Sequence, residues 1–145
     1  MPDQAAGLRQ PARRTPPVQG PTLMVVGLPG GAADTRPVVE RLAGWARRGR
    51  RWVGDPGAWR IVPLDPASPH LPLLASQQRR WALWVESDAD AFRRAYYTLK
   101  ILRRHPGPSR LLALHAPDLP RAGLLSNLQH GARRFLGVEL MVLSP

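Results

Sequence analysis

Apolar residues beyond residue 21 form two alternating kinds of segment, short uninterrupted runs and longer stretches with helical spacing. Short uninterrupted runs are typical of strands that are buried on both faces of a sheet. They predict strands at 22–26, 81–85, 111–114 and 138–143. Residues 60–64, with the sequence RIVPL, predict a further short strand that Pro63 interrupts.

Three longer stretches have apolar residues three or four positions apart, which predicts amphipathic helices. The first begins with Asp34 or Thr35 as its cap, has Pro37 in its first turn and extends to about Arg48. The second begins at Ser87 and is expected to bury a stripe of side chains, namely Phe92, Ala95, Tyr96, Leu99 and Leu102. The third, from about Pro120 to Leu136 with Asp118 as its cap, is expected to bury Leu124, Leu125, Leu128, Ala132, Phe135 and Leu136.

The alternation of strands and helices predicts an α/β protein, with a small parallel sheet covered by helices on both faces. Residues 49–59 are rich in turn formers, and the residues around Pro69 and Pro72 predict a loop. We divide the chain into a helix-capable peptide at 1–10, a proline-rich linker at 11–21 and an α/β domain at 22–145.

Composition narrows the possible chemistry of this 145-residue chain, which has room for one domain. It contains no Cys, which excludes disulfides, thiol catalysis and cysteine-ligated metals. Its net charge of +11 results from 21 basic and 10 acidic residues. Of the basic residues, 20 are Arg and one, Lys100, is lysine. The arginines are spread along the chain, so a GC-rich genome explains them better than nucleic-acid binding, which stays the alternative. No signal peptide or membrane-spanning run is evident, which predicts a cytoplasmic protein.

Side chains that commonly form catalytic or metal sites show no such pattern here. The four His residues lack ligand spacing, so we expect no metal site, and no serine lies in a G-x-S-x-G nucleophile elbow. Five Trp residues predict packing in the core and at edges rather than base stacking; they are Trp45, Trp52, Trp59, Trp81 and Trp84. On the first helix, Arg41, Arg47 and Arg48 are expected to lie on faces other than the apolar one.

The glycine-rich turn between the first strand and the first helix lies where α/β proteins bind phosphate groups, because free backbone N–H groups and the helix dipole favour an anion there. A working phosphate-binding loop also needs a lysine, and here Asp34 precedes Thr35. A structural turn is therefore the main interpretation, and weak nucleotide binding is the alternative. Asp65 ends the second strand as either a turn cap or a Mg²⁺ ligand.

Three stretches together resemble the flagellar-number regulators FlhG and FleN, which belong to the MinD/ParA group of P-loop ATPases. The first is the N-terminal DQAAGLR, similar to that family's DQAxxLR peptide ahead of a linker. The second, MVVGLPGGAADTRPVVERLAGWARRGRRWV, is similar to the Walker A frame KGGxGKT and its helix. The third, DADAFRRAYYTLKILRR with NLQHGARRFLGVELMVL, is similar to the C-terminal part of the ATPase domain.

The same resemblance exposes departures at the nucleotide site. Gly30 and Gly31 are retained and Thr35 matches the magnesium-binding position, whereas Pro29 and Asp34 stand where the two lysines belong. Asp65 is the candidate for the acidic residue of the second ATPase motif. His115 replaces an asparagine near the nucleotide base. We therefore expect a reduced, degenerate P-loop fold that is not an ATPase, with no resident cofactor (ATP and Mg²⁺ being the alternative) and no membrane-targeting helix.

The resemblance implies that the N-terminal peptide binds the signal-recognition-type GTPase FlhF and stimulates its GTP hydrolysis. Gln4 would approach the partner's nucleotide and help order a water molecule. Asp3 would cap the short helix that contains Ala5, Leu8 would anchor in an apolar groove and Arg9 would pair with an acidic rim. A flagellar transcription regulator is a second partner of this family. A chance match in a basic tail is the alternative interpretation of the peptide.

Overall fold

A computed structural model describes residues 20–29, 34–104 and 106–143, and the description below concerns these residues. They form one five-stranded sheet in the order β2-β1-β3-β4-β5, in which every neighbouring pair is parallel. The strands are β1 (Thr22–Val26), β2 (Arg60–Pro63), β3 (Trp81–Trp84), β4 (Arg110–Leu114) and β5 (Glu139–Met141). The predicted α/β class with a parallel sheet is confirmed.

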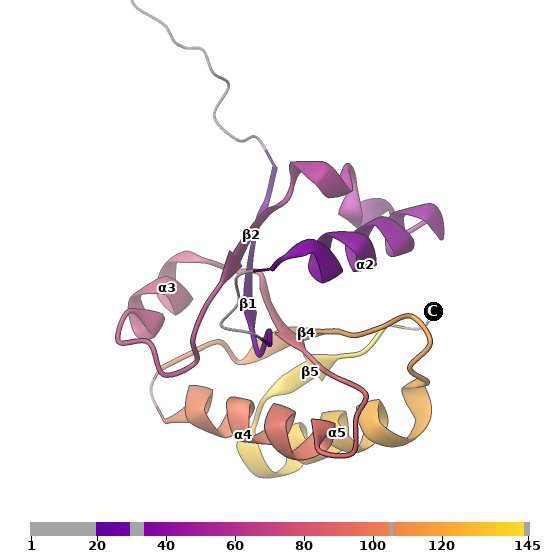
Figure 1. The fold of residues 1–145 in the computed structure, drawn as a ribbon. Helices are drawn as coiled ribbons and strands as arrows, with labels where there is room; N and C mark the ends of the chain where they lie inside the picture. The colour runs from indigo at the N-terminus through magenta and orange to yellow at the C-terminus, as the bar shows by residue number, and fades with distance from the viewer. Residues whose placement is uncertain (1–19, 30–33, 105, 144–145) are drawn as a thin grey trace, which may run out of the picture.

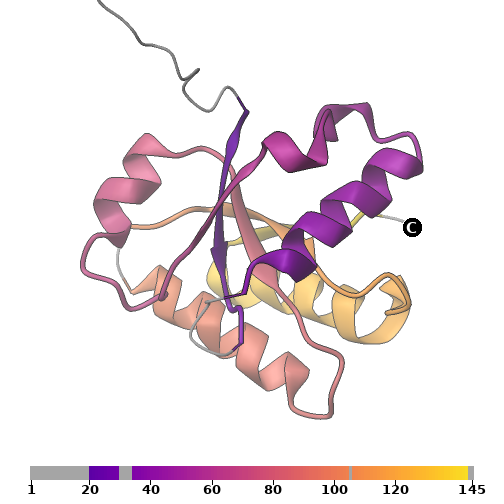
Figure 2. The same ribbon diagram turned by 45° about the horizontal axis from the view of Figure 1, so that its top comes forward.

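Helices cover both faces of the sheet (Figures 1 and 2). One face packs against α2 (Arg36–Arg47) and the short turns η2 (Arg51–Val53) and η3 (Pro56–Ala58). The other face packs against α3 (Leu71–Gln77), α4 (Ala91–Arg103) and the C-terminal helical segment, whose parts are η4 (Arg121–Leu125), α5 (Ser126–Gly131) and η5 (Ala132–Leu136). Figure 1 shows α4 and α5 side by side on this second face.

Alternating side chains of the central strands divide the core in two. Leu23 and Val25 of β1 join Val38, Leu42 and Trp45 of α2 in the cluster on one face. Met24 and Val26 of the same strand face the other way, into the larger cluster around α4 and α5. Because both faces are buried, the strands need apolar residues at successive positions, which is why uninterrupted runs predicted them correctly.

The edge strand β2 explains how Pro63 fits in the sheet. Proline has no N–H to donate, so it is tolerated where a strand has a neighbour on one side alone. Pro63 is the last residue of β2 and pairs with Val25 of β1. The proline therefore ends this strand rather than interrupting it.

One predicted loop and the start of one predicted helix were wrong. The residues around Pro72, expected as a loop, form α3, with Pro72 in its first turn, where a missing N–H costs nothing. The helix expected from Ser87 begins at Ala91, because the Asp88 carboxylate accepts the Asp90 N–H at 2.9 Å and closes a turn first.

The C-terminal helix also begins later than expected. Ala122 and Gly123 depart from helical geometry. The Gly123 N–H donates to the Ser126 hydroxyl oxygen at 3.1 Å, where the sequence predicted a cap from Asp118. Gly137 ends the segment in the left-handed conformation, with a φ of +66°.

Three burial predictions were also wrong. Phe92 and Phe135 are 39% and 69% exposed, although both were expected to face the core. Phe92 lies at the rim of the apolar stripe of α4 and stacks on Tyr96, with ring centroids 5.9 Å apart. Arg41 is the opposite case. This arginine was expected to lie away from the apolar face of its helix, but it is buried, with 4% of its surface exposed.

Candidate functional site

The carboxyl ends of the strands meet at one edge of the sheet, which is where parallel α/β proteins place their ligands. A cavity of about 620 Å³ opens there, and we call it the carboxyl-edge cavity. Its walls come from the residues after β1 (Gly27–Pro29), after β2 (Leu64–Pro66) and after β3, and from one side of α4. The structure thus brings Asp65 to the start of the glycine-rich turn.

Gly27 shapes the floor of this cavity where the chain leaves β1. Its φ of +89° lies in the left-handed region, which side chains other than that of glycine rarely adopt. A Cβ atom at this position would also lie 3.0 Å from the Trp84 carbonyl oxygen. Both constraints require glycine at the turn, independently of any ligand.

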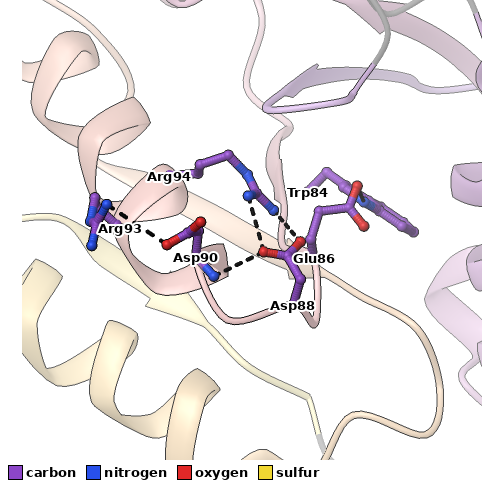
Figure 3. A network of polar contacts seen from close by, with 6 residues as sticks. All are labelled: Trp84, Glu86, Asp88, Asp90, Arg93 and Arg94. Atoms are coloured by element: carbon purple, nitrogen blue, oxygen red, sulfur yellow. Dashed lines mark hydrogen bonds and ion pairs between the residues drawn. The ribbon is translucent and has the colours of Figure 1, made fainter.

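The charged side chains of the carboxyl-edge cavity are mainly acidic. Asp65, Glu86 and Asp88 line it, and Arg94 is the one cation among the lining residues. Asp88 and Arg94 form a bidentate pair, with Arg94 Nη1 at 3.0 Å from Asp88 Oδ1 (Figure 3). The hydrogen bonds from Arg94, followed by the one from the Asp90 backbone, hold the pKa of Asp88 below its usual value.

Other polar side chains at and beside the carboxyl-edge cavity are also paired within the chain. The Trp84 indole N–H donates to Glu86 Oε2 at 3.1 Å, and Arg93 lies 3.7 Å from Asp90 (Figure 3). Asp65 Oδ1 accepts the Ala67 N–H at 2.9 Å, which is the turn-capping arrangement. Within the described residues, no group of three or more His, Asp or Glu side chains is placed to hold a metal ion.

The residues of the degenerate nucleotide loop are only partly described. Gly30 and Gly31 lie outside the described residues, as do Asp3, Gln4, Ala5, Leu8 and Arg9 of the N-terminal peptide. Asp34 is exposed and binds the Arg36 side chain at 3.0 Å, which keeps the pKa of Asp34 below its usual value. Asp34 also accepts the Arg36 backbone N–H, so it caps α2, while Thr35 makes no side-chain cap.

A second cavity of about 710 Å³ lies on the other face of the same edge, and we call it the α2–β4 pocket. Its walls are α2 from Pro37 to Arg48, Trp84 of β3 and residues 115–117 after β4. Buried Arg41 and His115 contribute to these walls. The sequence had marked His115 only through the family resemblance, and the burial of Arg41 had no sequence signal.

His115 is held in one orientation by its own loop. Its Nδ1 lies 2.8 Å from the Ala116 carbonyl oxygen, which assigns the ring proton to Nδ1, since a carbonyl only accepts. Burial, and to a smaller extent the charge of Arg41, lower the pKa of His115, so the ring is neutral at pH 7.

Comparison with known proteins leaves the family open. No protein-family model matches the chain, and no curated protein matches it. Among solved structures, the chain is similar to oxidised flavodoxin 1 from Bacillus cereus, with 12% identity and a TM-score of 0.36 over 87% of this chain and 86% of that chain. A likeness this remote carries no information on function. Within the described residues, no helix has both the length and the apolar character needed to cross a membrane.

Proposed function

We propose that this chain is a non-catalytic regulator similar to FlhG, whose α/β domain presents the N-terminal peptide to an FlhF-type GTPase and so influences flagellar number or placement. The acidic lining of the carboxyl-edge cavity is the observation that carries the non-catalytic part of the proposal. Three carboxylates line the position next to the glycine-rich turn, and the single guanidinium there is already bound to Asp88.

A nucleoside triphosphate would meet repulsion in this cavity. Like charges about 4 Å apart repel by roughly 1–4 kcal/mol near a protein surface. At the position of the phosphate-binding lysine, Asp34 places a carboxylate instead of a cation, and this carboxylate is bound to Arg36. These charges support a domain that has kept the α/β scaffold without the means to grip and hydrolyse ATP.

The N-terminal peptide supports the other half of the proposal. DQAAGLR precedes a proline-rich segment that cannot continue a helix, which is a suitable tether for a peptide that docks on a partner. Gln4 is the residue proposed to help order the hydrolytic water of the partner, and Leu8 is the proposed apolar anchor.

Steady-state GTP turnover by the FlhF-type GTPase of the same organism tests the proposal. The full chain is expected to stimulate turnover, and the double variant Gln4→Ala with Leu8→Ala is expected to lose that stimulation. Gln10→Ala, which changes a glutamine just outside the motif, is the matched control and should stimulate like the unmodified chain. Absence of stimulation, or full stimulation by the double variant, would show that the proposal is wrong.

A further inference from the structure

The α2–β4 pocket contains a buried cation that has no counter-ion among the described residues. Arg41 is 4% exposed, and neither its Nε nor its Nη2 has a hydrogen-bond partner within the part of the chain that the structure describes. The guanidinium lies over the Trp45 ring, 4.5 Å from its centroid, which holds the group in place without neutralising it. Burial, followed by the charge of Arg48, lowers the pKa of Arg41.

Leaving buried guanidinium nitrogens without acceptors is costly, because each loses its hydrogen bonds to water without replacement. Native proteins pair nearly all such groups, so an unpaired set points to an acceptor that is not among the described residues, and a bound ligand would supply one. His115 Nε2, on the opposite wall, also has no partner in the described ranges, and because the ring proton is on Nδ1, this nitrogen is an acceptor rather than a donor. The two residues that carry these buried nitrogens, Arg41 and His115, come from distant parts of the sequence and line one cavity.

The charge around the pocket favours a negative ligand. Arg41, Arg47 and Arg48 line it, against a single carboxylate from Glu40. Arg47 and Arg48 are exposed, which places mobile cations where an incoming anion would first be met. A guanidinium offers paired N–H donors that match the oxygens of a phosphate group.

The size and lining of the pocket exceed what a free inorganic ion needs. Its volume of about 710 Å³ is in the range of small-molecule sites, and Pro37, Ala43, Trp84 and Pro117 supply apolar wall. Gly44 keeps the space beside the guanidinium open. A Cβ there would lie 3.9 Å from Arg41 Nη1, so a longer side chain would enter the pocket.

We propose that the α2–β4 pocket binds a small phosphorylated organic molecule, with its phosphate on Arg41 and its organic part against Trp84. Arg47 and Arg48 steer the phosphate inward, and His115 lies on the wall opposite α2. Among its lining residues the site shares only Trp84 with the carboxyl-edge cavity, and the proposed regulatory function does not rest on it, so its failure would leave that function untouched.

Thermal unfolding of the full chain tests the site, with phenyl phosphate, inorganic phosphate and benzoate as probes at matched ionic strength. Phenyl phosphate is expected to raise Tm by about 3–6 °C at roughly ten times its Kd, and inorganic phosphate less at the same concentration. No rise with either phosphate overturns the proposal. An equal rise with benzoate overturns the assignment of a phosphate.

Variants separate ligand binding from a structural role of Arg41. Arg41→Met should fold with an undiminished Tm in phosphate-free buffer and should lose the phenyl phosphate effect, whereas Arg133→Met, an exposed arginine on the other face, should keep it. Gly44→Ala should retain binding and Gly44→Leu should abolish it, because only the longer side chain fills the space beside Arg41. Retention of the full Tm rise in both Arg41→Met and Gly44→Leu would contradict the proposal.

Discussion

The two cavities at the carboxyl edge of the sheet differ in how their charges are satisfied. In the carboxyl-edge cavity, Asp88 is bound to Arg94, Glu86 accepts from the Trp84 indole and Asp65 caps a turn. In the α2–β4 pocket, the Arg41 guanidinium has two nitrogens without a partner in the described ranges. Charges that are paired within the chain stabilise its folded state. An unpaired buried cation destabilises the ligand-free protein, and a bound ligand explains its presence.

Trp84 lies between the two regions and lines both cavities. Trp84→Ala should therefore have the largest effect, a loss of about 2–4 kcal/mol in the free energy of unfolding, because it leaves a cavity where the indole packs against the cluster on the α2 face. Urea denaturation measures this loss. Trp52→Ala is the control, since Trp52 is 47% exposed and should lose less than half as much. Equal losses would mean that the Trp84 indole contributes no more to stability than an exposed ring, which would contradict its packing role.

Arg41→Met distinguishes an unpaired cation from a paired one. Replacing a buried charge by an apolar side chain of similar length should leave the free energy of unfolding unchanged or raise it by about 1–3 kcal/mol in phosphate-free buffer. Arg94→Met is the matched variant in the other cavity, and it should destabilise slightly because it removes the partner of Asp88. A loss of stability for Arg41→Met larger than that for Arg94→Met would contradict the distinction.

The two regions should also titrate in different pH windows. The pKa of His115 is lowered in the folded state, so the unfolded chain takes up that proton first, and stability should fall as the pH drops below the unfolded value of about 6.5. Glu40, Arg41, Arg47 and Arg48 are the charged groups that line the same pocket. His115→Asn should remove this part of the pH dependence, as measured by Tm between pH 7 and pH 5. An unchanged profile in the variant would contradict it.

Asp88→Asn should give the smallest effect of the four. The folded pKa of Asp88 is depressed, so its contribution is present above the unfolded value of about 3.9 and is lost as the pH falls through the folded value. Both partners of this pair are about half exposed, so the contribution is small and decreases with salt. Comparing Tm of the variant at low and high salt measures it. A large, salt-independent loss would indicate a different role.

The sequence predicted the elements whose signals are local. Uninterrupted apolar runs located the strands, whereas the position of Asp65 beside the glycine-rich turn became visible only in the structure. It missed α3, because a seven-residue helix with Pro72 in its first turn has too short a pattern to separate from a loop. It also placed the start of α4 too early, because aspartate is typical both of turns and of helix caps, and Asp88 closes a turn before the helix begins.

The α2–β4 pocket could not be predicted in the same way. Arg41 and His115 lie far apart in the chain, and their meeting depends on how α2 crosses the strands. Helical spacing assigns Arg41 to a solvent-facing position, because the spacing carries no information on the residues after β4 that line the same pocket. Long-range packing therefore decides this site, while short-range pattern decides the sheet.

A calorimetric titration of the Arg41→Met variant with Mg-ATP tests the central claim that the α/β domain is a scaffold and not an ATPase. In this variant the α2–β4 pocket has lost its main cation, so any remaining affinity reports on the carboxyl-edge cavity. The account predicts no binding tighter than the millimolar range, which corresponds to about −4 kcal/mol. Saturable binding at micromolar ATP, accompanied by release of inorganic phosphate, would contradict it.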